Sequence, residues 1–194
     1  NPENMLPHLG ELAAYPYYVQ FTLTSYGRDI EPNLPDKKNR LIPTFQALSS
    51  KIGKERVVWR YDPIFLNRRY TVSYHLAAFS EIARRLRGYT ERVVISLIDL
   101  YAKTKRNTAG LFLSPPEGDT LFYMAGQMAQ IAQENGMMIE SCAESCDLQA
   151  VGVPHGSCID PRLIERIIGC PLRAAKDRNQ RAACGCVESI DIGA

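Results

Sequence analysis

Residues 92–101 read RVVISLIDLY, and the architecture of the chain follows from them. Their central run, VVISLI, is almost continuously apolar and rich in β-branched residues, a pattern typical of a strand covered on both faces. Strands of this kind belong to parallel sheets, in which a helix connects each strand to the next. The segment therefore predicts strand-helix units on either side of it.

Such units flank this strand on both sides in the sequence. Strands are predicted at residues 17–24, 57–65, 92–101 and 138–144. Helices are predicted at residues 40–53, 71–89, 120–136 and 158–169. Thr71 and Asp160 are suited to cap the second and fourth helices. The alternation predicts an α/β fold of parallel β/α units, and because four units cannot close an eight-stranded barrel, the sheet is either a partial, TIM-like barrel or open.

Composition indicates a soluble, single-domain protein. The 194 residues are 45% hydrophobic and 23% charged, with a formal net charge of +2, which gives no general reason to expect nucleic acid as a partner. No targeting segment and no apolar run of membrane-spanning length is visible, so a cytoplasmic location is expected. The six cysteines are better interpreted as thiols or metal ligands than as a disulfide framework.

Polar side chains gather where the predicted strands end. In parallel β/α folds ligands bind outside the carboxyl ends of the strands, so these residues are the candidates for catalysis and binding. The catalytic candidates are Arg60, Asp62, Asp99, Lys103 and Glu144, and the cofactor-binding candidates here are Thr22 and Tyr101. The alternative is structural: Arg60 and Asp62 form an internal ion pair, and Asp99 caps the following turn.

The Cys184-Gly185-Cys186 sequence near the end of the chain is half of a metal site. Two thiols separated by one glycine can lie on the same side of an extended segment, but a closed site normally needs four ligands. Cys142 and Cys158 are the expected partners, which predicts an auxiliary iron-sulfur cluster or zinc. The nearby KDRNQR stretch adds Lys176 and Arg181 as candidates for binding an anion or cofactor. The alternative is two thiols on a frayed tail.

Several segments resemble an uncharacterised bacterial family, the domain-of-unknown-function family numbered eighteen-forty-eight. They are FTLTSYGRDIEPNLP, ERVVWRYDPIF, VVISLIDLYAKTKRN, CAESCDL, HGSCID and KDRNQRAACGCVESIDIG. Family members are similar to radical S-adenosylmethionine enzymes in one respect, because a C-x3-C-x2-C motif follows the Cys-Gly-Cys. The resemblance implies a barrel or partial barrel, with a [4Fe-4S] cluster and S-adenosylmethionine in the full-length parent.

Neither that motif nor the family's first strand lies in this sequence. We therefore expect an internal fragment, with a partial barrel over residues 1–183 and a tail over residues 184–194 that leads toward a missing cluster segment. The parent is expected to act on an unknown small-molecule substrate, and the fragment to be an inactive scaffold.

Two other function classes stay open. A zinc- or cluster-stabilised nucleic-acid-binding module would use the KTKR run at residues 103–106 and the basic group Arg84, Arg85 and Arg87, although the balancing acidic residues make nucleic acid an improbable partner. A barrel enzyme without metal would act at the strand ends alone. A continuous basic patch would favour the first class, and an acid-containing cavity at the strand ends would favour an enzyme.

Overall fold

The protein is described by a computed structural model that covers residues 2–101, 104, 106, 108–142, 144–178 and 184–190. The strands are β1 (Val19–Thr22), β2 (Val57–Ile64), β3 (Arg92–Leu97) and β4 (Met138–Ser141). The α-helices are α1 (Ile42–Ile52), α2 (Val72–Leu86), α4 (Gly118–Glu134) and α5 (Pro161–Ile168). The remaining short helical segments are Pro2–Leu12, Lys37–Leu41, Lys54–Arg56, Ala109–Leu111 and Gln149–Val151.

The four strands form one parallel sheet in the order β1-β2-β3-β4, so each strand pairs with its neighbour in sequence. This confirms the α/β class. The pairing aligns Phe21 with Trp59 and Trp59 with Val93, which places these apolar side chains in one row across the sheet. The local signals also hold, because Thr71 accepts the Tyr74 N–H at the start of α2 and Asp160 accepts the Arg162 N–H at the start of α5.

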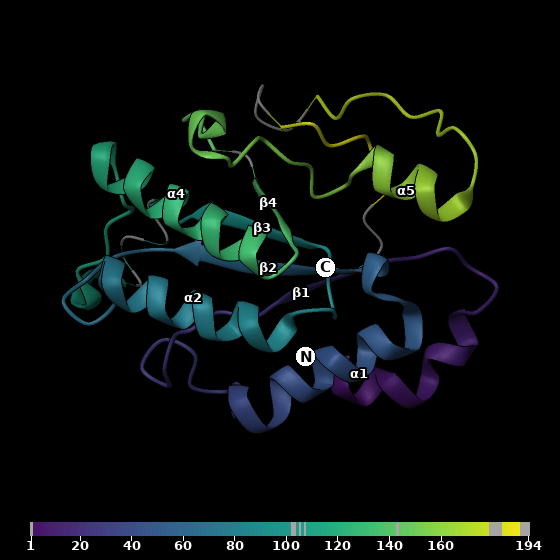
Figure 1. The fold of residues 1–194 in the computed structure, drawn as a ribbon, viewed down its shortest axis with the longest axis horizontal. Coiled ribbons are helices and arrows are strands. Elements are labelled where there is room, and N and C mark those ends of the chain that lie inside the picture. The colour runs from purple at the N-terminus through teal and green to yellow at the C-terminus, as the bar shows by residue number, and fades with distance from the viewer. Residues whose placement is uncertain are drawn as a thin grey trace.

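Alternation along β2 divides the sheet into two different faces. Trp59 and Tyr61 belong to the main core, which α1, α2 and α4 cover from one side (Figure 1). Val58 belongs instead to a smaller cluster on the opposite face, together with Val94 of β3 and Leu163 of α5. Because successive strand residues point to opposite faces, Arg60 and Asp62 share the second face with Val58. We call this second face the polar face.

Candidate functional site

Arg60 is the central charge of the polar face. Its guanidinium donates to the Asp62 carboxylate from Nε, at 3.0 Å, and also from Nη2. Nη1 donates to Gln20 Oε1 and to Cys158 Sγ, each at 2.7 Å. Burial disfavours the charge on Arg60, but the Asp62 carboxylate and the Cys158 sulfur outweigh it and raise the Arg60 pKa. The predicted internal ion pair of Arg60 and Asp62 is therefore present, and it also orients Arg60 toward a thiol.

Cys142 and Cys158 meet beside this guanidinium, with their sulfurs 2.6 Å apart. Cys142 directly follows β4, and Cys158 lies in the loop before α5. The backbone carbonyl of Cys158 accepts hydrogen bonds from the Tyr18 hydroxyl and the Gln20 side-chain amide, each at 2.6 Å. Two residues of β1 and its approach thus fix the backbone that carries the Cys158 thiol.

The two thiols have opposite protonation tendencies. The hydrogen bond from Cys142, with the Arg60 charge, lowers the Cys158 pKa to about 6 in spite of burial. The same hydrogen bond, with burial, raises the Cys142 pKa. The two thiols titrate as a coupled pair in which negative charge is favoured on Cys158, beside Arg60, over Cys142.

The Cys184-Gly185-Cys186 segment packs against the same loop. Cys184 is 2% exposed and Cys186 is 3% exposed, so neither thiol lies on a frayed, solvated tail. Cys186 Sγ accepts the backbone N–H groups of Cys158 and Ile159, at 3.2 and 3.4 Å. Burial raises the Cys186 pKa, and a hydrogen-bonded Cys184 thiol raises it further.

Gly185 favours this approach. A Cβ atom at this position would lie 2.4 Å from Ser157 Oγ, so glycine brings the two segments together without displacing that hydroxyl. The described residues therefore contain two thiol pairs, Cys142 with Cys158 and Cys184 with Cys186, joined through the backbone of Cys158. Within the described part of the chain, no group of three or more His, Cys, Asp or Glu side chains is arranged to hold a metal ion.

The other two cysteines lie apart from this arrangement. Cys146 packs against the main core, and Cys170 is exposed after α5. The four thiols singled out in the sequence are thus the four that the fold brings to the polar face. Ser96, whose hydroxyl donates to Asp62 Oδ2 at 3.3 Å, is one of the polar residues expected at the strand ends. The supporting residues Tyr18 and Gln20 were not predicted. Their signal is strand alternation, which places them on the face of Arg60 only once the pairing register is known.

The remaining predicted residues are dispersed. Asp99 and Glu144 line a pocket of about 280 Å³ beyond the carboxyl ends of β3 and β4. Glu144 Oε1 accepts the Leu97 N–H at 2.8 Å, and the Tyr101 hydroxyl donates to Asp99 at 3.2 Å. Thr22 is exposed at the end of β1, and Lys176 forms an antiparallel bridge with Val187. Lys103 and Arg181 lie outside the described residues.

A buried charge cluster lies on the polar face at the start of β3. Arg92 donates to Asp160 at 2.7 Å and lies 3.6 Å from Glu140. Burial raises the Glu140 pKa, in spite of Arg92. Glu140 Oε2 is the one buried side-chain nitrogen or oxygen in the described chain that has no hydrogen-bond partner. The cluster ties the α5 N-terminus to the sheet close to the cysteines.

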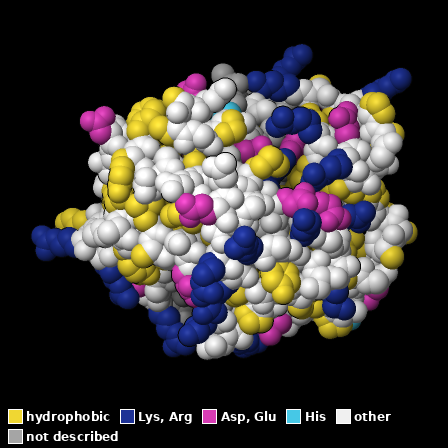
Figure 2. Space-filling view, in the orientation of Figure 1, with side chains coloured by type: hydrophobic (Ala, Val, Ile, Leu, Met, Phe, Trp, Pro, Cys, Tyr) yellow, Lys and Arg dark blue, Asp and Glu magenta, His cyan; other side chains and the backbone are white. Residues whose placement is uncertain are grey.

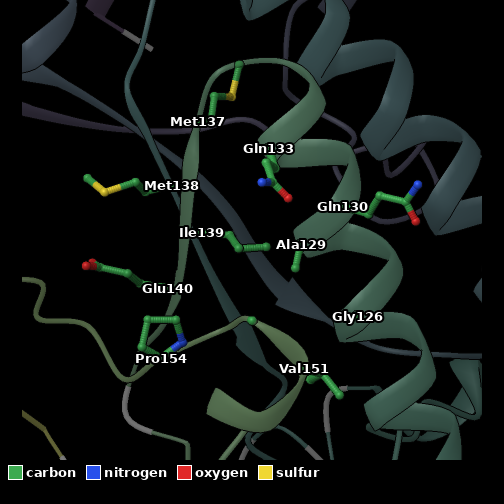
Figure 3. A pocket seen from close by; sticks show the side chains of 11 residues that line it. Gly126, Ala129, Gln130, Gln133, Met137, Met138, Ile139, Glu140, Val151 and Pro154 are labelled. Atoms are coloured by element: carbon green, nitrogen blue, oxygen red, sulfur yellow. The ribbon is translucent and has the colours of Figure 1, made fainter.

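A pocket of about 510 Å³ lies at the outer edge of β4 (Figure 3). Ala129, Gln130 and Gln133 of α4 form one wall, while Ile139 and Pro154 form another. In Figure 3 the Glu140 side chain points away from the α4 wall, toward the opposite side of the strand. The lining is mostly apolar and amide, with Glu140 as its one charged residue, and it contains no thiol, so this pocket is separate from the cysteine pairs.

Basic side chains on the surface are mixed with acidic ones. Figure 2 shows several groups of Lys and Arg with Asp and Glu between them on the face that it draws. Arg84 and Arg85 of α2 both pair with Glu81, at 2.8 and 2.5 Å. Glu81 offsets only part of the positive charge of this group, and its position between the two arginines interrupts the basic surface that a nucleic-acid interface would require. Among the described helices, none combines the length and the apolar character needed to cross a bilayer.

Comparison with known proteins gives one match. A family model described as Domain of unknown function (DUF1848) matches residues 1–194. No curated protein matches the chain, and no solved structure matches it. The family description assigns no activity.

Proposed function

Because the chain belongs to the DUF1848 family, which carries no assigned activity, we propose its function from the polar face: the chain is the scaffold of a metal-dependent enzyme and binds a soft metal centre through Cys142, Cys158, Cys184 and Cys186. The centre is zinc or an auxiliary iron-sulfur cluster. The observation that carries the proposal is the double role of Cys158, whose sulfur contacts Cys142 and whose backbone N–H contacts the sulfur of Cys186.

Thiolates in this number are the ligands that zinc and iron-sulfur clusters prefer. In a tetrahedral zinc site with Zn–S bonds of about 2.3 Å, the sulfurs are roughly 3.8 Å apart. The Cys142 and Cys158 sulfurs are closer than this, so binding requires them to separate by about 1 Å. The proposed site therefore forms by rotation of the cysteine side chains from their present positions, in which no three such groups of the described residues are arranged to hold a metal ion.

The surroundings supply the charge balance that such a centre needs. Four thiolates around a divalent ion leave a net negative charge, which hydrogen bonds and nearby cations stabilise. Arg60 donates to the Cys158 sulfur, and two backbone N–H groups donate to the Cys186 sulfur. These donors belong to the sheet and to the loop before α5, so they are held in place independently of the metal.

The strand order supports the finer proposal of a partial barrel. Each right-handed crossover moves one strand further in the same direction, which leaves the connecting helices on one face, as in a barrel and unlike a doubly wound sheet. The order β1-β2-β3-β4 with α1, α2 and α4 on one face has this form. The polar face would then be the inner wall of the barrel, with residues 1–183 as its body.

The family resemblance implies radical chemistry for the longer, full-length parent protein. Its cluster needs three cysteines in the C-x3-C-x2-C spacing, and no part of this sequence has that spacing. The cysteines of this sequence therefore do not fit that cluster. Asp99 and Glu144, which line a pocket at the strand ends, are proposed to contact the unknown substrate.

Metal analysis of anaerobically purified protein tests the proposal. We expect a stoichiometric amount of zinc or iron in the wild type, and thiolate-to-metal charge-transfer absorption after replacement by Co²⁺. Cys158→Ser should lose both signals, whereas Cys170→Ser, which changes an exposed cysteine outside the cluster, should keep them. Wild-type protein that remained free of metal after incubation with zinc and after cluster reconstitution would overturn the proposal.

A further inference from the structure

The Cys142 and Cys158 sulfurs lie much closer than ordinary non-bonded contacts. Their separation is 2.6 Å. Non-bonded heavy atoms usually lie about 3.5–4.0 Å apart, and a disulfide bond is about 2.0 Å long. The two thiols are therefore about 0.6 Å from bonding distance. In a protein without bound metal, this pair is poised for oxidation.

The backbones on either side of this pair are already fixed. The Ser141 N–H donates to Pro154 O, and the Gly156 N–H donates to Ser141 O, so the loop that carries Cys158 pairs with the end of β4. The Cys142 N–H donates to Ile95 O. Bond formation thus requires a side-chain movement and no rearrangement of the sheet.

The pair is more accessible than the other two proposed metal ligands. Cys142 and Cys158 are partly exposed, whereas Cys184 and Cys186 are buried. Cys170 is exposed but lies after α5, and Cys146 packs on the main core. A small oxidant in solution therefore meets the Cys142–Cys158 pair before it meets the Cys184–Cys186 pair.

We propose that Cys142 and Cys158 form a reversible disulfide that switches off metal binding at the four-cysteine site. The oxidant is a low-molecular-weight disulfide such as glutathione disulfide. The Cys158 thiolate attacks one of its sulfurs, forming a mixed disulfide and expelling one thiolate. Cys142 then loses its proton and attacks the Cys158 sulfur, expelling the second thiolate. The protein loses two electrons, and the small disulfide gains them as two thiols.

The effect of this disulfide on metal binding at the four-cysteine site rests on the proposed function. A disulfide withdraws two of the four ligands, so only Cys184 and Cys186 remain, and two thiolates are too few for a closed site. Reduction restores all four ligands. Conversely, bound metal keeps the Cys142 and Cys158 sulfurs apart and protects them from the oxidant.

Peptide mapping tests the disulfide itself. Metal-free protein is treated with glutathione disulfide, alkylated and cleaved after glutamate, because Glu144 lies between Cys142 and the other two cysteines of this region. We expect a cross-linked pair of peptides that disappears on reduction. It should persist in Cys146→Ser and Cys170→Ser and be absent in Cys158→Ser. Cys142→Ala, which leaves the Cys158 contact with Arg60 in place, should also lack it.

Zinc binding measured on the same samples tests the switch. Oxidised wild type should bind zinc at least tenfold more weakly than reduced wild type, and reduction should restore the affinity. Cys170→Ser should show the same loss on oxidation and the same recovery on reduction. Absence of the cross-link, or a cross-link with unchanged zinc affinity, overturns the proposal. If reduced wild type binds no metal while the cross-link still forms, the proposed metal-binding function is wrong, and the disulfide cannot regulate it. This result differs from a missing cross-link in a protein that binds zinc, which overturns the disulfide alone.

Discussion

At the residue scale, Gly185 affects how closely the segment with Cys184 and Cys186 packs against the Cys158 loop. A methyl group there would lie 2.4 Å from Ser157 Oγ but 3.8 Å from Ser157 Cβ, which is ordinary contact. We expect Gly185→Ala to lower stability by about 1 kcal/mol, since the obstructing hydroxyl is small, and to expose the Cys184 and Cys186 thiols. The rate of thiol labelling by a chromogenic disulfide measures that exposure.

A second substitution isolates the cause of this effect. Ser157→Ala removes the hydroxyl, so the Gly185→Ala, Ser157→Ala double variant should regain slow labelling. Gly10→Ala is the control, because a methyl group there meets no atom within 4 Å. Equal labelling rates in Gly185→Ala and in the double variant would show that the hydroxyl contact is not the reason for glycine.

The burial of His75 determines how the stability of the folded protein changes with pH. It is fully buried, Tyr61 donates to its Nδ1, and its Nε2–H donates to Phe65 O. Burial lowers its pKa in the folded protein. As pH falls below the unfolded value of about 6.5, the unfolded chain takes up a proton that the folded chain does not, so stability is lost until the folded pKa is reached.

We therefore expect His75→Gln to be less stable at pH 7 but to lose less stability than wild type between pH 7 and pH 5. Urea unfolding at several pH values gives the difference in slope. His8→Gln serves as the control, because the His8 side chain is 68% exposed. Parallel wild-type and His75→Gln profiles would contradict the assignment of the proton uptake to His75.

At the element scale, α5 holds the cysteine loop on the sheet. Leu163 is 3% exposed and packs with Val58 and Val94, and Asp160 at the start of the helix binds Arg92. Leu163→Ala should lower the free energy of unfolding by about 2–5 kcal/mol and increase the labelling rate of Cys158 and Cys186. Arg162→Ala, at a side chain that is 74% exposed, should change stability by less than about 0.5 kcal/mol. Equal effects of the two variants would show that α5 does not clamp the loop.

The elements also show what the sequence could and could not predict. Continuous apolar character predicted β3, and the caps Thr71 and Asp160 marked the starts of α2 and α5, because these signals are local. The contact of Arg60 with Cys158 joins residues 98 positions apart and depends on a loop that pairs with the end of β4. Local periodicity carries no information on such a pairing, so the cysteines could be named from their type and spacing but their grouping into two pairs could not.

At the scale of the whole molecule, the four cysteines connect the end of β4, the loop before α5 and the C-terminal segment. A ligand that binds only the folded state stabilises it by RT ln(1 + [L]/Kd), which is about 4 kcal/mol at a free concentration one thousand times Kd. For a chain of this size that corresponds to a rise in Tm on the order of 10 °C. Because the proposed metal ligands come from all three segments, the stabilisation should appear in the unfolding of the whole domain.

Thermal unfolding of reduced protein with and without zinc measures this stabilisation. Zinc should raise the Tm of Cys170→Ser by as much as it raises that of wild type. Cys186→Ser should lose most of this rise, because Cys186 is the thiol that joins the C-terminal segment to the Cys158 loop. A zinc chelator should return wild type to the Tm of the metal-free protein. If Cys186→Ser rose as far as wild type, zinc would be bound without the C-terminal segment, and the metal would not connect these three parts of the fold.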